Sequence, residues 1–147
     1  METSLSYNNI SFYNKNRRPR INKDKVSAWL RHISKREGYK IIDLNYTFCS
    51  DDSLLEINIQ YLNHNYYTDI ITFDLSDIPR EIEGDIYISI DRVKENAKIN
   101  HSNFEEELLR VLAHGLLHLM GYKDKSKEEA SLMRKKEEEA IELYRLN

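Results

Sequence analysis

Two histidines and a nearby aspartate are the residues best suited to chemistry in this sequence. His114 and His118 lie four residues apart in an apolar run that begins at Arg110 and ends at Gly121. In a helix this spacing places both imidazoles on one face, roughly 6 Å apart, where they can share one metal ion. Gly121 predicts the end of the helix, since glycine has no Cβ to oppose a left-handed backbone. The turn that follows would bring Asp124 back over the histidines as a third ligand.

A metal bound by these three residues would keep one coordination position free. Two imidazoles and a carboxylate leave the fourth position of a tetrahedral Zn²⁺ open for water, as in catalytic rather than structural zinc sites. One such ion per chain would lower the pKa of the bound water toward neutrality and polarise a substrate oxygen, which suits hydrolysis. The alternative is that the two rings are hydrogen-bonded core residues. The glycine and the carboxylate at the end of the helix favour the metal site.

The residue after the first histidine separates this pattern from that of the zinc peptidases. In those enzymes a glutamate at that position is the general base, whereas this chain has Gly115. Glycine cannot transfer a proton, so the sequence argues against peptide hydrolysis. Asp69 and Asp85 are the candidates for an acid or base from another part of the chain, and each could equally be a turn or capping residue. Phosphodiester cleavage depends more on charge neutralisation and positioning, for which a metal with nearby cations is sufficient.

The composition is that of a single-domain globular protein. A chain of 147 residues can bury a sizeable core, so we predict one domain over residues 1–147. No apolar run approaches the length of a membrane span, and the polar N-terminus lacks the apolar segment of a signal peptide. Cys49 is the only cysteine, which excludes an internal disulfide and indicates the reducing cytoplasm.

The charges are distributed unevenly along the chain. The formal net charge is −3, yet residues 15–40 carry ten Lys or Arg against two acidic residues, and residues 41–91 have Arg80 as their sole base. Such asymmetry predicts a basic face that can meet phosphates, the alternative being a solvated helix surface. The candidate nucleic-acid contacts in this basic segment are Arg17, Arg18, Arg20, Arg31, Lys35 and Arg36.

Strands and helices alternate along the sequence. Alternating or β-branched apolar residues predict strands at Leu5–Tyr13, Lys40–Cys49, Ile70–Phe73 and Ile86–Ile90. Asn22 predicts the N-cap of a helix that runs to about Glu37 and contributes Trp29 to the core. Asp51 or Asp52 would cap a second helix that ends near Asn63, and Asp91 a short third one.

Two capping boxes frame the C-terminal part. Ser102 with Glu105 predicts the start of the helix that carries the histidines, and Ser126 with Glu129 predicts the start of the last helix. The charge run at 134–139 is expected to form the solvated face of that last helix. These elements predict one α+β domain, with the metal site on a helix and on the turn that follows it.

Three sequence blocks together resemble the YbeY family of bacterial ribosomal-RNA maturation factors. HGLLHLMGYKD at His114–Asp124 is similar to the family signature HGxLHLxGYDH. TDIITF at Thr68–Phe73 resembles TDVLSF, and GDIYIS at Gly84–Ser89 resembles GDIxIS. The blocks keep the family's order, and the resemblance covers nearly the whole chain. It implies a small α+β fold in which helices pack on a mixed sheet of about four strands, with zinc in a cleft.

The resemblance also implies a function. YbeY proteins are described as metal-dependent endoribonucleases, so the chain is expected to cleave single-stranded RNA in the 3′-end maturation of 16S ribosomal RNA and in ribosome quality control. Its implied partners are ribosomal RNA, the small ribosomal subunit and assembly factors, with no membrane. The alternatives are a non-catalytic ribosome-assembly factor with a structural zinc and, with less support, a metallopeptidase.

This sequence departs from the family pattern at two places. The third metal ligand of the family is usually histidine, and Asp124 stands there, whose negative charge would weaken the metal as a Lewis acid. The family's LNxxYR segment carries an arginine thought to contact RNA. Here Leu62 and Asn63 lead through His64, Asn65, Tyr66 and Tyr67 directly to Thr68, and no arginine matches. His64 or a basic residue from the segment 15–36 would have to replace this arginine.

Overall fold

A four-stranded mixed sheet organises the protein, as seen in the computed structural model, which describes residues 9–146. The strands are β1 (Ile10–Asn14), β2 (Lys40–Cys49), β3 (Ile70–Asp74) and β4 (Glu81–Ser89), in the order β1-β2-β4-β3. β1, β2 and β4 run parallel, while β3 pairs antiparallel with β4 and forms an edge of the sheet. This confirms the predicted α+β fold with a mixed sheet. The part of the first predicted strand before residue 9 lies outside the described residues.

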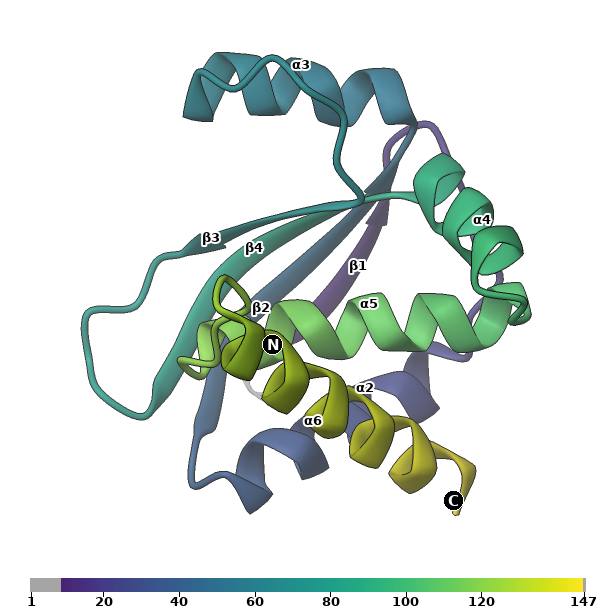
Figure 1. Ribbon diagram of the computed structural model, residues 1–147. Helices are drawn as coiled ribbons and strands as arrows, with labels where there is room; N and C mark the ends of the chain where they lie inside the picture. Colours follow the sequence, from purple (N-terminus) through teal and green to yellow (C-terminus); the bar gives the residue numbers. More distant parts are fainter. Residues whose placement is uncertain (1–8, 147) are drawn as a thin grey trace.

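Five helices within residues 9–146 surround the sheet: α2 (Lys23–Arg36), α3 (Asp51–Leu62), α4 (Ile90–Ile99), α5 (Phe104–Leu119) and α6 (Lys127–Arg145). Figure 1 shows α2, α5 and α6 on one side of the sheet and α3 on the opposite side, while α4 continues directly from the end of β4. Among the described helices, none is both long enough and apolar enough to cross a membrane.

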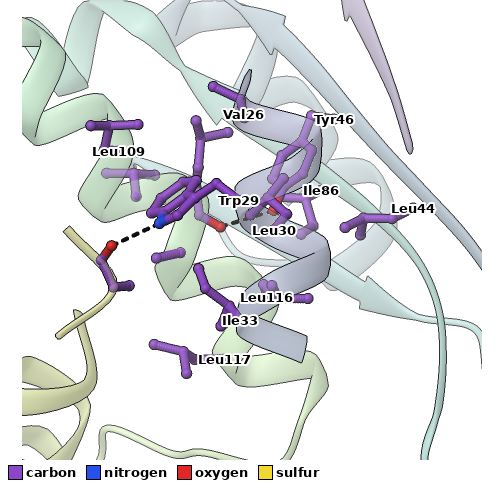
Figure 2. Packing of buried hydrophobic residues seen from close by; sticks show 14 of the residues in the cluster. Val26, Trp29, Leu30, Ile33, Leu44, Tyr46, Ile86, Leu109, Leu116 and Leu117 are labelled. Carbon is purple, nitrogen blue, oxygen red and sulfur yellow. Dashed lines mark hydrogen bonds between the residues drawn. The ribbon is translucent and has the colours of Figure 1, made fainter. Parts of the chain in front are cut away.

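The main core lies between the sheet and the layer of α2, α5 and α6. Trp29 of α2 is buried as predicted, and its indole Nε1–H donates to the carbonyl of Ala140 in α6 at 2.7 Å (Figure 2). Tyr46 of β2 is fully buried, and its hydroxyl donates to the carbonyl of Leu112 in α5 at 2.9 Å. Each aromatic ring therefore buries its apolar area while its polar atom keeps a partner. These two bonds tie the helix layer to itself and to the sheet.

Two glycines lie where the histidine-bearing helix packs against the sheet. A Cβ on Gly115 of α5 would lie 2.8 Å from Ile86 Cδ1 and 3.1 Å from Ile70 Cδ1. A Cβ on Gly84 of β4 would lie 2.8 Å from the Leu119 side chain and 2.9 Å from the Phe73 carbonyl oxygen. A Cβ at either position would force these neighbouring atoms to shift. The glycine that removes the peptidase base is thus required by packing.

A smaller apolar cluster covers the opposite face of the sheet. It consists of Cys49, Leu54, Ile57 and Ile71, with Phe73 and Tyr87 packed against it. These residues belong to α3 and to the strand positions that point away from α5, as expected from the alternation of side chains along a strand. The cluster fixes α3 over the edge strand β3, and so fixes the segment between them.

Three predicted helix starts are wrong by one or two residues. The observed N-caps of α3, α4 and α5 are Ser50, Ser89 and Asn103, where the sequence predicted Asp51 or Asp52, Asp91 and Ser102. In each case the observed cap has an extended backbone and its side-chain oxygen accepts the N–H three residues later. The displaced aspartates instead occupy the first turn of their helices, where the helix dipole favours negative charge.

Other predicted boundaries are confirmed. Asn22 caps α2, and Ser126 forms a complete capping box with Glu129 at the start of α6. The strand predicted at Ile86–Ile90 is longer at its start, because β4 begins at Glu81, and Ile90 is already the first residue of α4.

Candidate metal centre

The structure brings His114, His118 and Asp124 together at the C-terminal end of α5. Asp124 Oδ2 lies 3.3 Å from His114 Nε2 and 3.5 Å from His118 Nε2. The two imidazole centroids are 4.6 Å apart with their planes at 78°. All three side chains are partly exposed, so the group is open to solvent on one side. No other cluster of three such groups with metal-binding spacing occurs within residues 9–146.

This donor set fits a small divalent ion. Bonds of about 2.0–2.1 Å in a tetrahedron place neighbouring ligand atoms about 3.3–3.4 Å apart. The observed separations between the carboxylate oxygen and the two imidazole nitrogens are 3.3 and 3.5 Å. The ligand atoms of the three residues all lie within 4.8 Å of one another, so one ion can bind all three once the two imidazoles close on it.

The turn that carries Asp124 is held in place by α2 and α6. Gly121 has φ +96°, the left-handed conformation predicted for it. The Tyr122 hydroxyl donates to Glu37 Oε1 at 2.8 Å, and Lys136 Nζ donates to Glu37 Oε2 at 3.1 Å. Burial by itself would raise the pKa of Glu37, but these two hydrogen bonds and the lysine charge lower it below its ordinary value. The charged carboxylate fixes Tyr122, two residues before Asp124.

Glu137 of α6 orients the first histidine. The Nδ1 of His114 lies 2.7 Å from Glu137 Oε2, and the carboxylate is 5% exposed. Because Nδ1–H donates to this carboxylate, the lone pair of Nε2 points toward Asp124 and is free to bind a metal. Burial by itself would lower the pKa of His114, but the hydrogen bond to Glu137 and the charges of Glu137, Asp124 and Asp69 raise it above its ordinary value.

Sequence reasoning missed Glu137. The run 134–139 was predicted to be solvated, and for Glu137 that prediction is wrong. The signal that would have revealed it is its phase in the helix. The buried residues of α6 are Met133, Glu137, Ala140, Ile141 and Tyr144, so a single carboxylate stands on an otherwise apolar stripe. Arg110 of α5 accompanies it, with guanidinium nitrogens 3.5 Å from Glu137 and 2.5 Å from Glu138.

A cleft of about 490 Å³ opens beside the three candidate ligands. Its walls are the C-terminal half of α5, the edge strand β3 and the segment between α3 and β3. Asp69 lines this cleft, and burial raises the pKa of its carboxyl above the ordinary value although the nearby His114 acts in the opposite direction. A raised pKa makes this carboxyl a better proton acceptor than an ordinary aspartate.

Asp85, the other predicted acid or base, is placed elsewhere. On β4 its neighbours Gly84 and Ile86 face α5, so the alternation of the strand directs Asp85 to the opposite face of the sheet. Its carboxylate there accepts a hydrogen bond from Asn45 Nδ2 at 3.1 Å. The sheet separates Asp85 from the histidines, so Asp85 is not part of the site.

The basic residues predicted to contact RNA do not line the cleft either. Arg17 is paired with Asp91 at 2.8 Å, and Arg18 and Arg20 follow the end of β1. The remaining three, Arg31, Lys35 and Arg36, belong to α2. None of the six lines the cleft, and no Lys or Arg is among the described residues that line it.

Comparison with known proteins identifies the family. A family model described as Endoribonuclease YbeY matches residues 11–145. The chain belongs to the YbeY family. Among relatives named Endoribonuclease YbeY, that of Cytophaga hutchinsonii is 58% identical over 118 residues, which cover 80% of this chain and 82% of the relative. That of Flavobacterium johnsoniae is 49% identical over 123 residues, covering 84% and 88%.

A solved structure has a similar fold. The solution structure of TM1509 from Thermotoga maritima matches with a TM-score of 0.65 and 28% sequence identity, over 92% of this chain and 88% of that chain. The resemblance predicted from the three sequence blocks is confirmed. In this YbeY chain the histidine pair and Asp124 therefore stand where the family signature led us to expect metal ligands.

Proposed function

We propose that the protein is a zinc-dependent endoribonuclease that cleaves single-stranded RNA. One observation carries the proposal: in a chain of the YbeY family, two imidazoles and a carboxylate converge at 3.3 and 3.5 Å beside an open cleft. His114, His118 and Asp124 would hold one Zn²⁺ per chain. The donor set of two imidazoles and one carboxylate, with room for a fourth ligand, is typical of catalytic zinc.

The residues around the metal have separate tasks in this proposal. Held by His114, His118 and Asp124, a zinc ion would supply positive charge at the scissile phosphodiester and would activate water for its hydrolysis. Glu137 holds the ring of His114 so that Nε2 faces the metal position. Asp69, from the opposite wall of the cleft, accepts or returns a proton at its carboxylate, whose raised pKa suits this exchange.

The biological substrate in this proposal is ribosomal RNA. We place the protein in the cytoplasm, where it would act on the 3′ end of 16S ribosomal RNA and in ribosome quality control, together with the small subunit and assembly factors. The names of its relatives support the reaction, and the buried thiol of Cys49 is compatible with a reducing compartment.

Cleavage by the purified protein tests this function. Zinc-loaded protein is incubated with single-stranded ribosomal RNA, next to His114→Ala, His118→Ala and the control His32→Ala, which removes an exposed histidine of α2. We expect cleavage by the wild type and the control, and its loss in both ligand variants and after chelation. Equal cleavage by all four proteins would show a contaminating nuclease and contradict the proposal.

A second candidate is a non-catalytic assembly factor in which zinc stabilises the fold. The observation that favours it is the lack of Lys and Arg in the described lining of the cleft, while the basic residues lie on other surfaces. Charge reversal at Arg31, Lys35 and Arg36 would then abolish association with the small subunit, whereas loss of the open coordination position on the metal would spare it. Ribosome association that survives the charge reversal would exclude this candidate.

A further inference from the structure

The segment between α3 and β3 is where this chain lacks the expected arginine, and the structure shows which side chains of this segment face the cleft. His64 and Tyr66 line the same cleft as His114, His118 and Asp124. Their rings are stacked, with centroids 5.2 Å apart and planes at 19°, and Tyr66 Oη lies 3.0 Å from His64 Nδ1. Tyr66 is 56% exposed, and His64 is exposed as well. Two joined aromatic rings are thus presented to solvent at the rim of the metal cleft.

This pair is held by a buried polar anchor. Asn58 of α3 is 2% exposed, and its side-chain Nδ2 donates to the carbonyl of Tyr66 at 2.9 Å. Its own backbone carbonyl accepts the N–H of His64 at 3.1 Å. Between them Asn63 adopts a left-handed backbone with φ 57°, which reverses the chain at the end of the helix. The rings are therefore carried by a backbone that is fixed at both residues before any ligand arrives, which lowers the entropic cost of binding.

The charge around the pair argues against a phosphate clamp. The described residues that line the cleft include Asp69, Asp74 and Asp124 but no Lys or Arg. Arg92 approaches the segment over the ring of Tyr67, at 5.5 Å from its centroid, yet its guanidinium is paired with Asp51 at 2.7 Å. A polyanion would gain little from side-chain charge here. Stacking of a base on an aromatic ring does not depend on charge and accepts any base.

We propose that the His64–Tyr66 pair is a stacking platform for an unpaired base of single-stranded RNA. The platform holds the strand at the mouth of the cleft, with its backbone directed toward the candidate metal ligands. Double-stranded RNA keeps its bases inside the helix and cannot use such a platform, so this surface selects single strands. The inference rests on the proposed function and adds to it the element that binds the substrate.

The test compares tyrosines that differ in position. Tyr66→Ala removes the outer ring, Tyr66→Phe keeps the ring without the hydroxyl, and Tyr61→Ala removes a tyrosine of α3 that is 64% exposed and does not line the cleft. Zinc-loaded proteins are mixed with a short single-stranded RNA that carries 2-aminopurine, whose fluorescence is quenched by stacking. A matched RNA that lacks the base at the same position is bound in parallel, and KM and kcat are measured for cleavage.

We expect Tyr66→Ala to lose the quenching and to raise KM at least about fivefold, the lower bound for one stacked base, with little change in kcat. Tyr66→Phe and Tyr61→Ala should retain the quenching and the wild-type KM. The RNA that lacks the base should bind the wild type and Tyr66→Ala with the same affinity. Quenching and KM that are unchanged in Tyr66→Ala would overturn the platform. Equal damage in Tyr66→Ala and Tyr66→Phe would overturn it too, because the hydroxyl rather than the ring would then be responsible.

The same experiment distinguishes a failure of the platform from a failure of the proposed nuclease function. If the wild type cleaves no RNA, the nuclease proposal fails, but the quenching still decides the platform. Quenching by the wild type that disappears in Tyr66→Ala supports a base-binding surface, whereas its absence in the wild type overturns one.

Discussion

Replacing Glu137 by glutamine should weaken zinc binding by about 10- to 100-fold, the usual effect of losing the partner of a metal-binding histidine. Glutamine has nearly the volume of glutamate, and its amide oxygen can still accept the Nδ1–H of His114. The substitution therefore removes the negative charge at 2.7 Å from the ring while it leaves the shape of the core unchanged. That charge makes His114 Nε2 a more basic ligand, which is the property under test.

The loss corresponds to about 1.4–2.8 kcal/mol of zinc-binding free energy. The fold should tolerate the change because Arg110 remains close to three other carboxylates. Glu138 lies 2.5 Å from its guanidinium, and Glu106 and Glu107 lie within 3.7 and 3.9 Å. No buried cation is left without a partner, so the large penalty for an unpaired buried charge does not arise.

A neighbouring glutamate provides the matched control. Glu138→Gln changes the net charge equally and alters the contacts of Arg110, but its side chain is 59% exposed and makes no contact with His114 in the described part of the chain. Zinc affinity is measured for wild type and both variants by competition with a chromogenic chelator, and the unfolding of the metal-free proteins in urea is recorded. Only Glu137→Gln should lose zinc affinity. An unchanged affinity in a folded Glu137→Gln protein, or an equal loss in both variants, would refute the role given to Glu137.

Three further predictions concern the helix, the turn and the third ligand. Gly115→Ala places a methyl group 2.8 Å from Ile86 Cδ1 and should destabilise the protein by about 1–3 kcal/mol in urea unfolding; an unchanged midpoint would contradict the close packing of α5 on the sheet. Asp124→Ala should lower zinc affinity by more than about tenfold, whereas Asp124→His should keep zinc and lower the KM for RNA by removing a negative charge near the phosphate; equal zinc affinity in Asp124→Ala and wild type would remove Asp124 from the site. The lowered pKa of Glu37 stabilises the fold above its unfolded value of about 4.5, and this contribution disappears as the pH falls through the lower folded value. Glu37→Gln should therefore be less stable than wild type at pH 7, and this difference should shrink as the pH falls below the folded pKa of Glu37; a difference that stays constant with falling pH would disprove this linkage.

Local patterns in the sequence predicted the fold well. Helical spacing of apolar residues and strand alternation found every described helix and strand, and the glycine stop at Gly121 predicted the turn that returns Asp124 to the histidines. The errors at the N-caps arose because serine, asparagine and aspartate side chains within two residues of one another can each accept the first N–H groups of a helix. The choice between them depends on where the preceding element ends, which is a tertiary property.

The rest of the site depends on contacts between residues that are far apart in the sequence. Glu137 reaches His114 from a different helix, and its place in a charge run concealed its burial. Asp69 and Asp85 are equivalent in sequence terms, yet the alternation of β4 sends Asp85 to the other face of the sheet. The role proposed for Tyr66 likewise depends on Asn58, whose burial on α3 is not expected for an amide until its contacts with the following segment are known.

The contact of Gly115 with the sheet limits what this scaffold can become through evolution or design. The two-histidine pattern of the zinc peptidases needs only one more residue, a glutamate in place of this glycine. Here that side chain would enter an apolar layer formed by Ile70 and Ile86, where its charge would have no partner. Space for it would first have to be made in two strands, at positions that also support the histidine helix. A short mutational path from nucleic-acid cleavage to protein cleavage is thus blocked by the sheet beneath the active helix.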